Sequence, residues 1–301
     1  MPVFQFPMVF PSDGALLAAR VYRNIDDLVE PQPTVIVTGS WLTVKEQMPH
    51  TYALRLAERG LTAVTFDFTG FGRSGGAPRQ LELPLRKIRD IIAAADFLST
   101  LSFVSGRTAG HAGVCASAQY ALAAIARGAR IRAFASVAGW YHDAQSVAPF
   151  YGGADGVALR LGRAREALEV YATSGDVVTV PAYAPGDDRA GMFFDLDYYG
   201  QRGRGAVPEW KNAMAEMAWA GWLTFDGLSA ASDVTVPTLM VHGEGCVLPE
   251  NARAVYAALR GPKELVWTEG SQIDFYDQPR QVDAAVEAMV PHFGEVLGRI
   301  G

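Results

Sequence analysis

The sequence is poor in cysteine and has no long run of apolar residues. Its 301 residues include two cysteines, Cys115 and Cys246, so neither a disulfide framework nor a cysteine-rich metal site is expected, and a reducing compartment suits the chain. Nowhere do about 18 uncharged apolar residues follow one another, and the first ten residues lack the basic start and apolar stretch of a signal peptide. We therefore expect a cytoplasmic protein without a membrane-spanning segment.

Basic clusters are also absent. The formal net charge is −6, and without runs of Lys and Arg the chain offers no electrostatic footprint for nucleic acid. No spacing of His, Cys and carboxylates is typical of a metal site, so we expect neither a metal nor another cofactor. Half of the residues are hydrophobic, enough for a large core. The sequence leaves open whether the protein forms a homodimer.

The hydrophobic pattern alternates between short apolar runs and helical periods. An antiparallel hairpin is expected first, with strands at 3–9 and 15–22 joined through an Asp-Gly turn. The later apolar runs are typical of strands buried on both faces of a parallel sheet, at 34–38, 63–66, 108–113, 131–137, 238–241 and 264–267. Helical patterns separate them, at 46–58, 85–100, 116–126, 250–259 and 281–297. The fold class is α/β, with a doubly wound, mostly parallel sheet that has an antiparallel start.

One connection is much longer than the others. Residues 144–233 separate the strand at 131–137 from the strand at 238–241 and contain many aromatic residues among short helical stretches. Long connections of this kind are usually functional. We predict a helical cap at 144–233, inserted into a core made of 1–143 and 234–301. Most of its aromatic side chains are expected to form the cap's own core, and some to contact substrate.

Residues 113–117, Gly-Val-Cys-Ala-Ser, lie between a predicted strand and a predicted helix. Small residues two positions on either side of Cys115 are what a nucleophile elbow requires, because the chain turns so sharply that larger side chains would collide with the backbone. The turn places the thiol at a helix N-terminus, where the helix dipole favours the thiolate. The alternative is that Cys115 is an unreactive buried residue.

Four segments together carry a resemblance to the α/β-hydrolase superfamily, near dienelactone hydrolases and prolyl-oligopeptidase-like esterases. They are residues 37–41 (Val-Thr-Gly-Ser-Trp), 67–75 (Asp-Phe-Thr-Gly-Phe-Gly-Arg-Ser-Gly), the Cys115 elbow and 237–243 (Pro-Thr-Leu-Met-Val-His-Gly). The resemblance covers nearly the whole chain and implies an α/β-hydrolase fold, in which cysteine is an accepted nucleophile. It also implies an oxyanion hole made by the backbone N–H groups of Ala116 and Trp41.

The acid and base that this family pairs with the nucleophile are not at their usual positions. Cys246 stands where the resemblance implies an aspartate, and Gln272 stands where it implies the histidine. Glutamine cannot accept a proton. Among the five histidines, His142 is the one expected at the catalytic edge of the sheet, so we predict His142 as the base and the neighbouring Asp143 as the acid. The alternatives are a hydrogen-bonded structural role for His142 and a helix-capping role for Asp143.

Five further residues are predicted to contact substrate. Glu46 stands close to the position where dienelactone hydrolases keep a glutamate beside the thiol, although its alternative role is to favour a helix N-terminus. Gln272, Glu244, Trp140 and Tyr141 are expected at the same edge of the sheet.

Three functions follow. The first is a cysteine-dependent enzyme acting on an ester, lactone or thioester of a hydrophobic metabolite, in which a missing histidine predicts slow hydrolysis or transfer to a better acceptor. The second is a non-hydrolytic cyclase or lyase, favoured if Gln272 and no histidine lies near the thiol. The third is a ligand-binding protein without chemistry, which would be stabilised by ligand but show no turnover.

Overall fold

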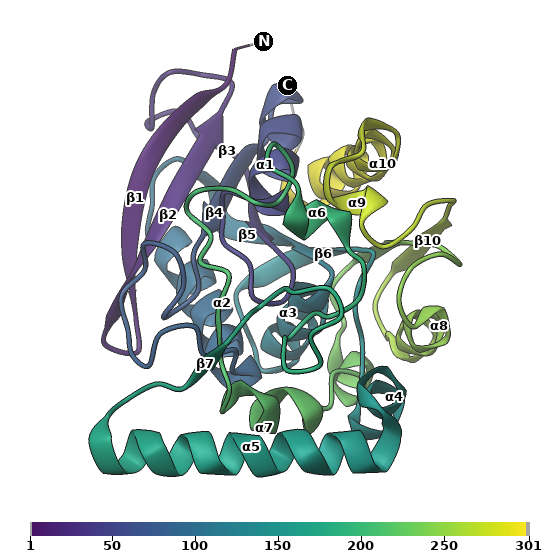
Figure 1. Cartoon of the computed structure of the whole chain (residues 1–301). Helices are drawn as coiled ribbons and strands as arrows, with labels where there is room; N and C mark the ends of the chain where they lie inside the picture. The colour runs from purple at the N-terminus through teal and green to yellow at the C-terminus, as the bar shows by residue number, and fades with distance from the viewer. Residues whose placement is uncertain (1, 299–301) are drawn as a thin grey trace.

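The computed structural model describes residues 2–298, and an eight-stranded sheet runs through its centre (Figure 1). The strands lie in the order β1-β2-β4-β3-β5-β6-β9-β10. Their bounds are β1 Phe4–Ser12, β2 Ala15–Arg23, β3 Gln32–Thr38, β4 Thr62–Phe66, β5 Val104–Val114, β6 Ile131–Val137, β9 Thr238–His242 and β10 Lys263–Trp267. The predicted fold class is confirmed: the sheet is doubly wound, with helices on both faces.

The sheet is antiparallel where the chain begins and parallel elsewhere. β1 pairs with β2, and β2 with β4, in antiparallel register, whereas every pair from β4 to β10 is parallel. The β1–β2 turn needs positive φ at both central residues, and Asp13 (φ 43°) and Gly14 (φ 77°) supply it. Because parallel strands share one direction, β3, β5, β6, β9 and β10 all end at the same edge, and a site at this edge can draw on every following loop.

Helices cover the two faces of the sheet. They are α1 Met48–Glu58, α2 Pro84–Leu98, α3 Ala116–Ala126, α8 Pro249–Ala258, α9 Asp274–Asp277 and α10 Pro279–Leu297. Helices α1 and α10 contact each other and strands β2 to β6, while α2 and α3 contact each other on the other face. Helix α3 is buried along ten successive residues, 116–125, so alanines occupy much of it. Their small side chains let the helix pack closely from all sides.

The segment between β6 and β9 holds short helices and one long helix. Its elements are α4 Ala144–Val147, η1 Ala148–Tyr151, α5 Gly153–Ser174, β7 Thr179–Val180, α6 Asp197–Gly200, β8 Met214–Ala215, α7 Ala218–Leu223 and η2 Ser229–Asp233. Helix α5 runs along the bottom of the molecule in Figure 1 and packs on α7. Strands β7 and β8 form a separate antiparallel pair. The independence of this segment as a domain stays a prediction.

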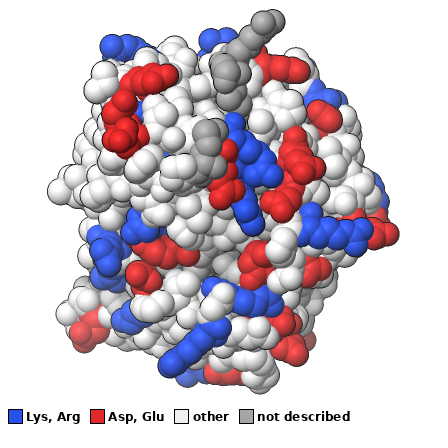
Figure 2. Space-filling model, turned by 90° about the horizontal axis from the view of Figure 1, so that it is seen from above, with Lys and Arg blue, Asp and Glu red and all other residues white. Residues whose placement is uncertain are grey.

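The surface carries charges of both signs. Figure 2 shows acidic and basic side chains interspersed over the face seen from above, without a broad area of one sign. Within residues 2–298, no helix combines the length and the apolar composition needed to cross a bilayer.

Candidate active site around Cys115

Cys115 stands at the sharp turn between β5 and α3. Its backbone has φ 56° and ψ −125°, a conformation that non-glycine residues rarely adopt and that is usually found where function requires it. Its N–H donates to the Val137 carbonyl and its own carbonyl accepts from Ala118 and Trp140, all at 3.0 Å. These backbone bonds hold the turn in its uncommon conformation, in which Cys115 lines a cavity.

Gly113 makes the turn possible. A Cβ atom at this position would lie 2.8 Å from the Ala118 Cα atom, closer than real Cβ contacts allow, and backbone atoms cannot move aside as a side chain can. Ser117 is buried and donates to the Val114 carbonyl at 3.2 Å. The lack of a side chain at Gly113 is therefore required by the close approach of its backbone to that of Ala118.

The loop after β3 brings a second backbone donor to the thiol. The backbone N–H groups of Ala116 and Trp41 both act to lower the pKa of the Cys115 thiol, so they lie close to its sulfur. Two such donors are the arrangement that stabilises an oxyanion during acyl transfer. Leu42, next to Trp41, has φ 60°, so this loop too is held in an uncommon conformation.

A buried carboxylate holds that loop. The Leu42 N–H donates to the Glu82 carboxylate at 2.9 Å, and Glu82 also accepts from Lys87 and from the Tyr120 hydroxyl, each at 2.8 Å. Glu82 is 0% exposed and Lys87 is 1% exposed. Because a buried charge is costly unless it is paired, the Glu82–Lys87 pair fixes Glu82 where Leu42 can bond to it.

The thiol itself is buried. Cys115 is 3% exposed, and burial raises the pKa of its thiol, against smaller opposing effects of the Ser40 and Tyr276 hydroxyls and of the Ala116 and Trp41 N–H groups. Burial disfavours the charged thiolate more than these donors favour it. The neutral thiol is therefore the resting form at neutral pH, contrary to the thiolate that the helix N-terminus alone predicts.

Three hydroxyl groups form a cluster beside the sulfur. The Tyr199 hydroxyl donates to Ser40 Oγ at 3.1 Å, and Ser40 Oγ lies 3.3 Å from the Tyr276 hydroxyl oxygen. Tyr276 lines the same cavity as Cys115, and its hydroxyl acts to lower the pKa of the Cys115 thiol. We call Ser40, Tyr199 and Tyr276 the hydroxyl cluster. Its members come from the loop after β3, from α6 and from α9.

A cavity of about 180 Å³ opens over the sulfur. Aromatic and aliphatic side chains from the core and from residues 144–233 make up most of its wall. It is lined by Ser40, Trp41, Cys115, Trp140, Phe150, Tyr151, Gly191, Met192, Phe194, Leu196, Tyr199, Trp222, Val247, Gln272, Ile273 and Tyr276. The rings of Trp41 and Trp222 stack with centroids 4.5 Å apart. The lining contains no Asp, Glu, Lys, Arg or His, so the site suits an uncharged, apolar group.

Gln272 occupies the wall at the position where the family resemblance implies histidine. Its amide nitrogen donates to the Ala138 carbonyl at 2.7 Å and to the Tyr276 hydroxyl at 3.4 Å. Its amide oxygen accepts from the Val247 N–H at 3.0 Å. The side chain is thus held at both ends, and it orients Tyr276 but cannot accept a proton from Cys115.

The loop after β9 supplies no carboxylate to the cavity. Cys246 is buried there, and burial raises the pKa of its thiol to about 12, so it stays neutral. Glu244 points outward and pairs with Arg253 at 2.6 Å, with 68% of its side chain exposed. Glu244, predicted to contact substrate, does not line the cavity.

His142 and Asp143, predicted as base and acid, do not join Cys115 in the cavity. His142 Nδ1 accepts from the Trp140 indole at 2.8 Å, and Nε2 donates to the Trp222 carbonyl at 2.8 Å. Burial lowers the pKa of His142 to about 4. Both ring nitrogens are occupied, so His142 connects the core to residues 144–233. Asp143 caps α4 through the N–H groups of Gln145 and Ser146. In both cases the structural alternative describes the contacts observed.

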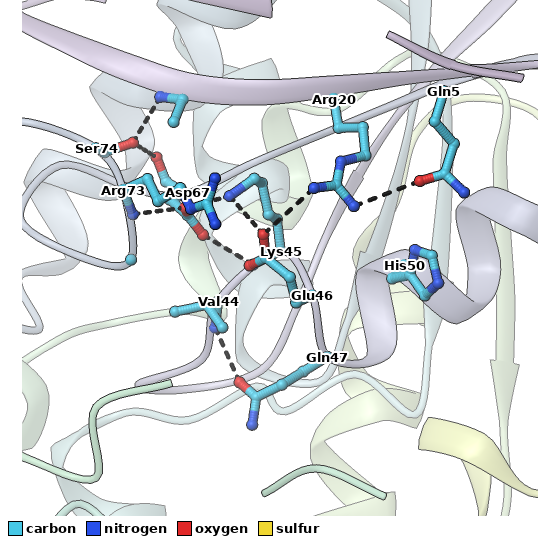
Figure 3. A network of polar contacts seen from close by, with 12 residues as sticks. Gln5, Arg20, Val44, Lys45, Glu46, Gln47, His50, Asp67, Arg73 and Ser74 are labelled. Carbon is cyan, nitrogen blue, oxygen red and sulfur yellow. Dashed lines mark hydrogen bonds and ion pairs between the residues drawn. The ribbon is translucent and has the colours of Figure 1, made fainter. Parts of the chain in front are cut away.

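Two other predicted contacts also lie away from the cavity. Tyr141 is buried outside the cavity wall. Glu46 pairs with Lys45 at 2.8 Å and lies 3.9 Å from Arg20. Figure 3 shows this network, in which Lys45 also reaches Asp67 at 2.6 Å. Glu46 therefore belongs to an ion-pair cluster with Lys45, Asp67 and Arg20, and it does not line the cavity beside the thiol.

The structure brings some predicted residues together and adds others. Cys115, Trp41, Trp140 and Gln272 all line the cavity, and the Ala116 N–H faces the sulfur. The tyrosines of the hydroxyl cluster are not among the residues predicted from the sequence. Tyr276 lies four residues after Gln272, one helical turn further on, and this spacing is a signal that can identify it. Nothing local indicates the second tyrosine, on α6, because residues 144–233 fold back over a long distance in sequence.

The family model for X-Pro dipeptidyl-peptidase (S15 family) matches residues 13–271, most of the chain. The chain belongs to the S15 family. Among similar proteins, the uncharacterised protein PA2218 of Pseudomonas aeruginosa is 30% identical over 277 residues, which cover 88% of this chain and 74% of that protein. Its crystal structure superposes with a TM-score of 0.83, covering 98% of this chain and 94% of the other.

Two fungal proteins extend the comparison of this S15-family chain. The acyltransferase drtE of Aspergillus calidoustus is 26% identical over 299 residues, covering 95% of this chain and 92% of the fungal one. The α/β hydrolase GrgF of Penicillium sp. sh18 superposes with a TM-score of 0.81 at 18% identity, covering 99% of each chain. The α/β-hydrolase fold expected from the sequence is confirmed, and the S15 family match and the similarity to drtE support a hydrolase-like enzyme.

Proposed function

We propose that this protein transfers an apolar acyl group from a thioester, with Cys115 as the nucleophile that carries the acyl group between donor and acceptor. One observation supports this most strongly. The Cys115 sulfur faces an apolar cavity beneath the N–H groups of Ala116 and Trp41, while all five histidines lie within residues 2–298 and none lines the cavity. The site can stabilise an oxyanion but has no histidine to move protons.

The leaving group decides which acyl donor suits such a site. A thiol has a pKa near 8.5, so a thiolate departs from the tetrahedral intermediate far more readily than an alkoxide or an amine, which needs a proton from a general acid. Exchange between the Cys115 thiol and a thioester also makes and breaks bonds of the same type. A thioester is therefore the donor that least requires a histidine.

The reaction named for the S15 family is less suited to this site. Cleavage of a peptide bond needs an acid that protonates the leaving amine, and histidine normally serves. Gln272 cannot supply or take up a proton in this way. An N-terminal amine of a peptide would also need a carboxylate or acceptor to receive it, and no acidic side chain lines the cavity.

The acceptor follows from the same reasoning. Water attacks an acyl-enzyme efficiently only when a base removes its proton, so hydrolysis should be slow. A thiol, or an alcohol held beside the acyl group, including one within the substrate itself, reacts with less assistance because proximity replaces part of the activation. The name of drtE, an acyltransferase, supports transfer over hydrolysis.

The test is direct detection of the acyl-enzyme. Incubation with the octanoyl thioester of N-acetylcysteamine should add one octanoyl group to the intact protein, located on Cys115 by peptide mapping. Cys115→Ala should remain unmodified, and the control Cys246→Ala should be acylated like the wild type. An unmodified wild-type protein, or an adduct that persists in Cys115→Ala, would contradict the proposal.

A second candidate is a non-hydrolytic cyclase or lyase in which Cys115 is only part of the cavity wall. It is favoured by the position of Gln272, which lines the cavity without any histidine beside it. To distinguish the two candidates, wild-type and Cys115→Ala proteins are assayed in ¹⁸O-labelled water. If the product contains no ¹⁸O and Cys115→Ala is still active, the second candidate is indicated. If the product contains no ¹⁸O and Cys115→Ala is inactive, acyl transfer to an acceptor other than water is indicated.

A further inference from the structure

The hydroxyl cluster has a directed set of hydrogen bonds. Gln272 donates its amide N–H to the Tyr276 oxygen, and Tyr199 donates its O–H to Ser40. The oxygen of Tyr276 thus has an N–H donor fixed on one side, which leaves its own O–H free to point toward the Cys115 sulfur or Ser40. Gln272 cannot transfer a proton, but it sets the direction in which Tyr276 donates.

Burial keeps every member of this arrangement neutral. Ser40 is 3% and Tyr276 is 2% exposed, and burial raises the pKa of Tyr276 well above its usual value. Tyr276 therefore does not act as a phenolate base. A neutral hydroxyl can nevertheless accept one proton while it releases another, and this exchange needs no net charge in the apolar cavity.

We propose that Tyr276, with Ser40, relays the thiol proton of Cys115 to the departing sulfur of the acyl donor. As the Cys115 sulfur bonds to the carbonyl carbon, its proton passes to the Tyr276 oxygen, and the Tyr276 proton passes to the leaving sulfur, directly or through Ser40. The carbon–sulfur bond of the donor breaks. The products are S-acyl-Cys115 and a neutral thiol, and Tyr276 ends with one proton, as it began.

The relay rests on the proposed acyl transfer and makes a distinct claim about pH. If a neutral thiol reacts, the acylation rate should be nearly constant between pH 6 and 8. If a thiolate must form first, the rate should rise tenfold per pH unit below the thiol pKa. The titratable groups that interact electrostatically with Cys115 are Tyr120, Tyr151, Tyr199, Tyr276, Cys246 and Lys87, and Lys87 pairs with Glu82.

Those surroundings do not obscure the pH test. Burial raises the pKa of each of these tyrosines and of Cys246 from values that already lie above neutrality. Burial lowers the pKa of Lys87, and its ion pair with Glu82 at 2.8 Å opposes that lowering. Wild-type and Tyr276→Phe proteins share this pair, so a difference between their pH slopes reports on the reaction at Cys115.

The experiment measures acyl-enzyme formation by acid quench and intact mass, with the octanoyl N-acetylcysteamine thioester, from pH 6 to 9. The wild type should show a nearly flat profile. Tyr276→Phe should acylate about 10²-fold more slowly at pH 6.5, the lower end of what a positioned proton donor contributes. Its rate should then rise about tenfold per pH unit, because only the thiolate still reacts.

Tyr198→Phe is the matched control. Tyr198 is a buried tyrosine whose ring packs against Tyr276 with centroids 5.1 Å apart, but it does not line the cavity. Its loss of a hydroxyl should leave both rate and profile unchanged. A structural effect of removing a buried hydroxyl would slow both variants, while loss of the relay slows Tyr276→Phe alone.

The possible outcomes separate the two proposals. Wild-type protein that forms no acyl-enzyme overturns the proposed function. Wild-type and Tyr276→Phe proteins that acylate at equal rates, or with parallel pH slopes, overturn only the relay. If Tyr276→Phe does not fold, the wild-type rate in mixtures of H₂O and D₂O decides. If two protons move in the rate-limiting step, the acylation rate depends on the deuterium fraction along a curve. A linear dependence of the rate overturns the relay.

Discussion

The two sides of the cavity around Cys115 differ in how closely they keep the catalytic groups that the family resemblance implies. On one side, the elbow and the loop after β3 present two backbone N–H groups to the sulfur, as the family resemblance implies. On the other side, the loops after β9 and β10 carry Cys246 and Gln272 where aspartate and histidine are implied. In the proposed reaction the first side binds the electrophile, whereas in the family pattern the second side moves protons. The difference teaches what the proposal requires: a leaving group good enough to depart without a histidine.

Replacing the nucleophile Cys115 should have the largest effect on acylation. We expect Cys115→Ser to lose at least about 10³-fold in acylation, because a serine hydroxyl attacks only when a general base activates it. Acyl-enzyme formation measured by intact mass checks this. Near-wild-type activity of the serine variant would mean that a base is present after all, and Cys115→Ala serves as the inactive reference.

Removing the support of the oxyanion loop should cost stability as well as rate. Glu82→Leu leaves Lys87 buried without its partner, for which we expect a loss of about 3 kcal/mol in the free energy of unfolding. Chemical denaturation measures this. The double variant Glu82→Leu with Lys87→Met should recover most of the stability, since no buried charge remains.

The same double variant separates stability from positioning. It still lacks the acceptor for the Leu42 N–H, so its acylation should stay about tenfold slower, as expected for the loss of one net hydrogen bond of about 1.4 kcal/mol. Full recovery of both stability and rate would show that Glu82 has no part in placing the loop.

Restoring the second side should convert transfer into hydrolysis. Gln272→His combined with Cys246→Asp rebuilds the base and acid of the family pattern, and we expect hydrolysis of the acyl-enzyme to rise about 10²-fold, within the usual range for general-base catalysis. Decay of the mass adduct measures it. Cys246→Asp alone is the control and should not accelerate decay. An unchanged decay rate in the double variant would place the catalytic water elsewhere.

The last prediction concerns His142, which does not line the cavity and should affect stability and not catalysis. Its folded-state pKa of about 4 is below the ordinary value of 6.5, so between these values the unfolded chain binds more protons and stability falls as the pH falls. From pH 7 to pH 5, His142 alone should cost about 2 kcal/mol in the free energy of unfolding. Denaturation at both pH values measures this.

His142→Gln is the matched variant for that measurement. A glutamine amide can accept from Trp140 and donate to the Trp222 carbonyl as His142 does, but it does not titrate. Its loss of stability between pH 7 and pH 5 should be smaller than that of the wild type by the same amount. Equal losses would mean that His142 is protonated in the folded protein.

The sequence predicts the fold well. Of the predicted site residues, Cys115 and Trp41 on the first side lie at the cavity, whereas His142, Asp143 and Glu244 do not. Gly113 stands two residues before Cys115 because the backbone of α3 leaves no room for a Cβ atom there, so a small residue at this position indicates the turn. His142 has no comparable pattern: its place at a strand end is apparent, but the direction of its side chain depends on Trp140 and Trp222, which lie on different elements. The α6 tyrosine of the hydroxyl cluster depends on a fold-back of residues 144–233 that no local pattern indicates.

The stacked indoles of Trp41 and Trp222 have a practical consequence. Their ring centroids lie 4.5 Å apart, and Trp140 lies 5.6 Å from Trp222, so these chromophores border the same hollow that a ligand would fill. A molecule that enters the cavity changes the surroundings of these indoles and therefore alters their fluorescence emission and near-ultraviolet circular dichroism. The protein thus contains its own optical reporter, and candidate compounds can be screened by titration without a label, an assay for turnover or an identified substrate.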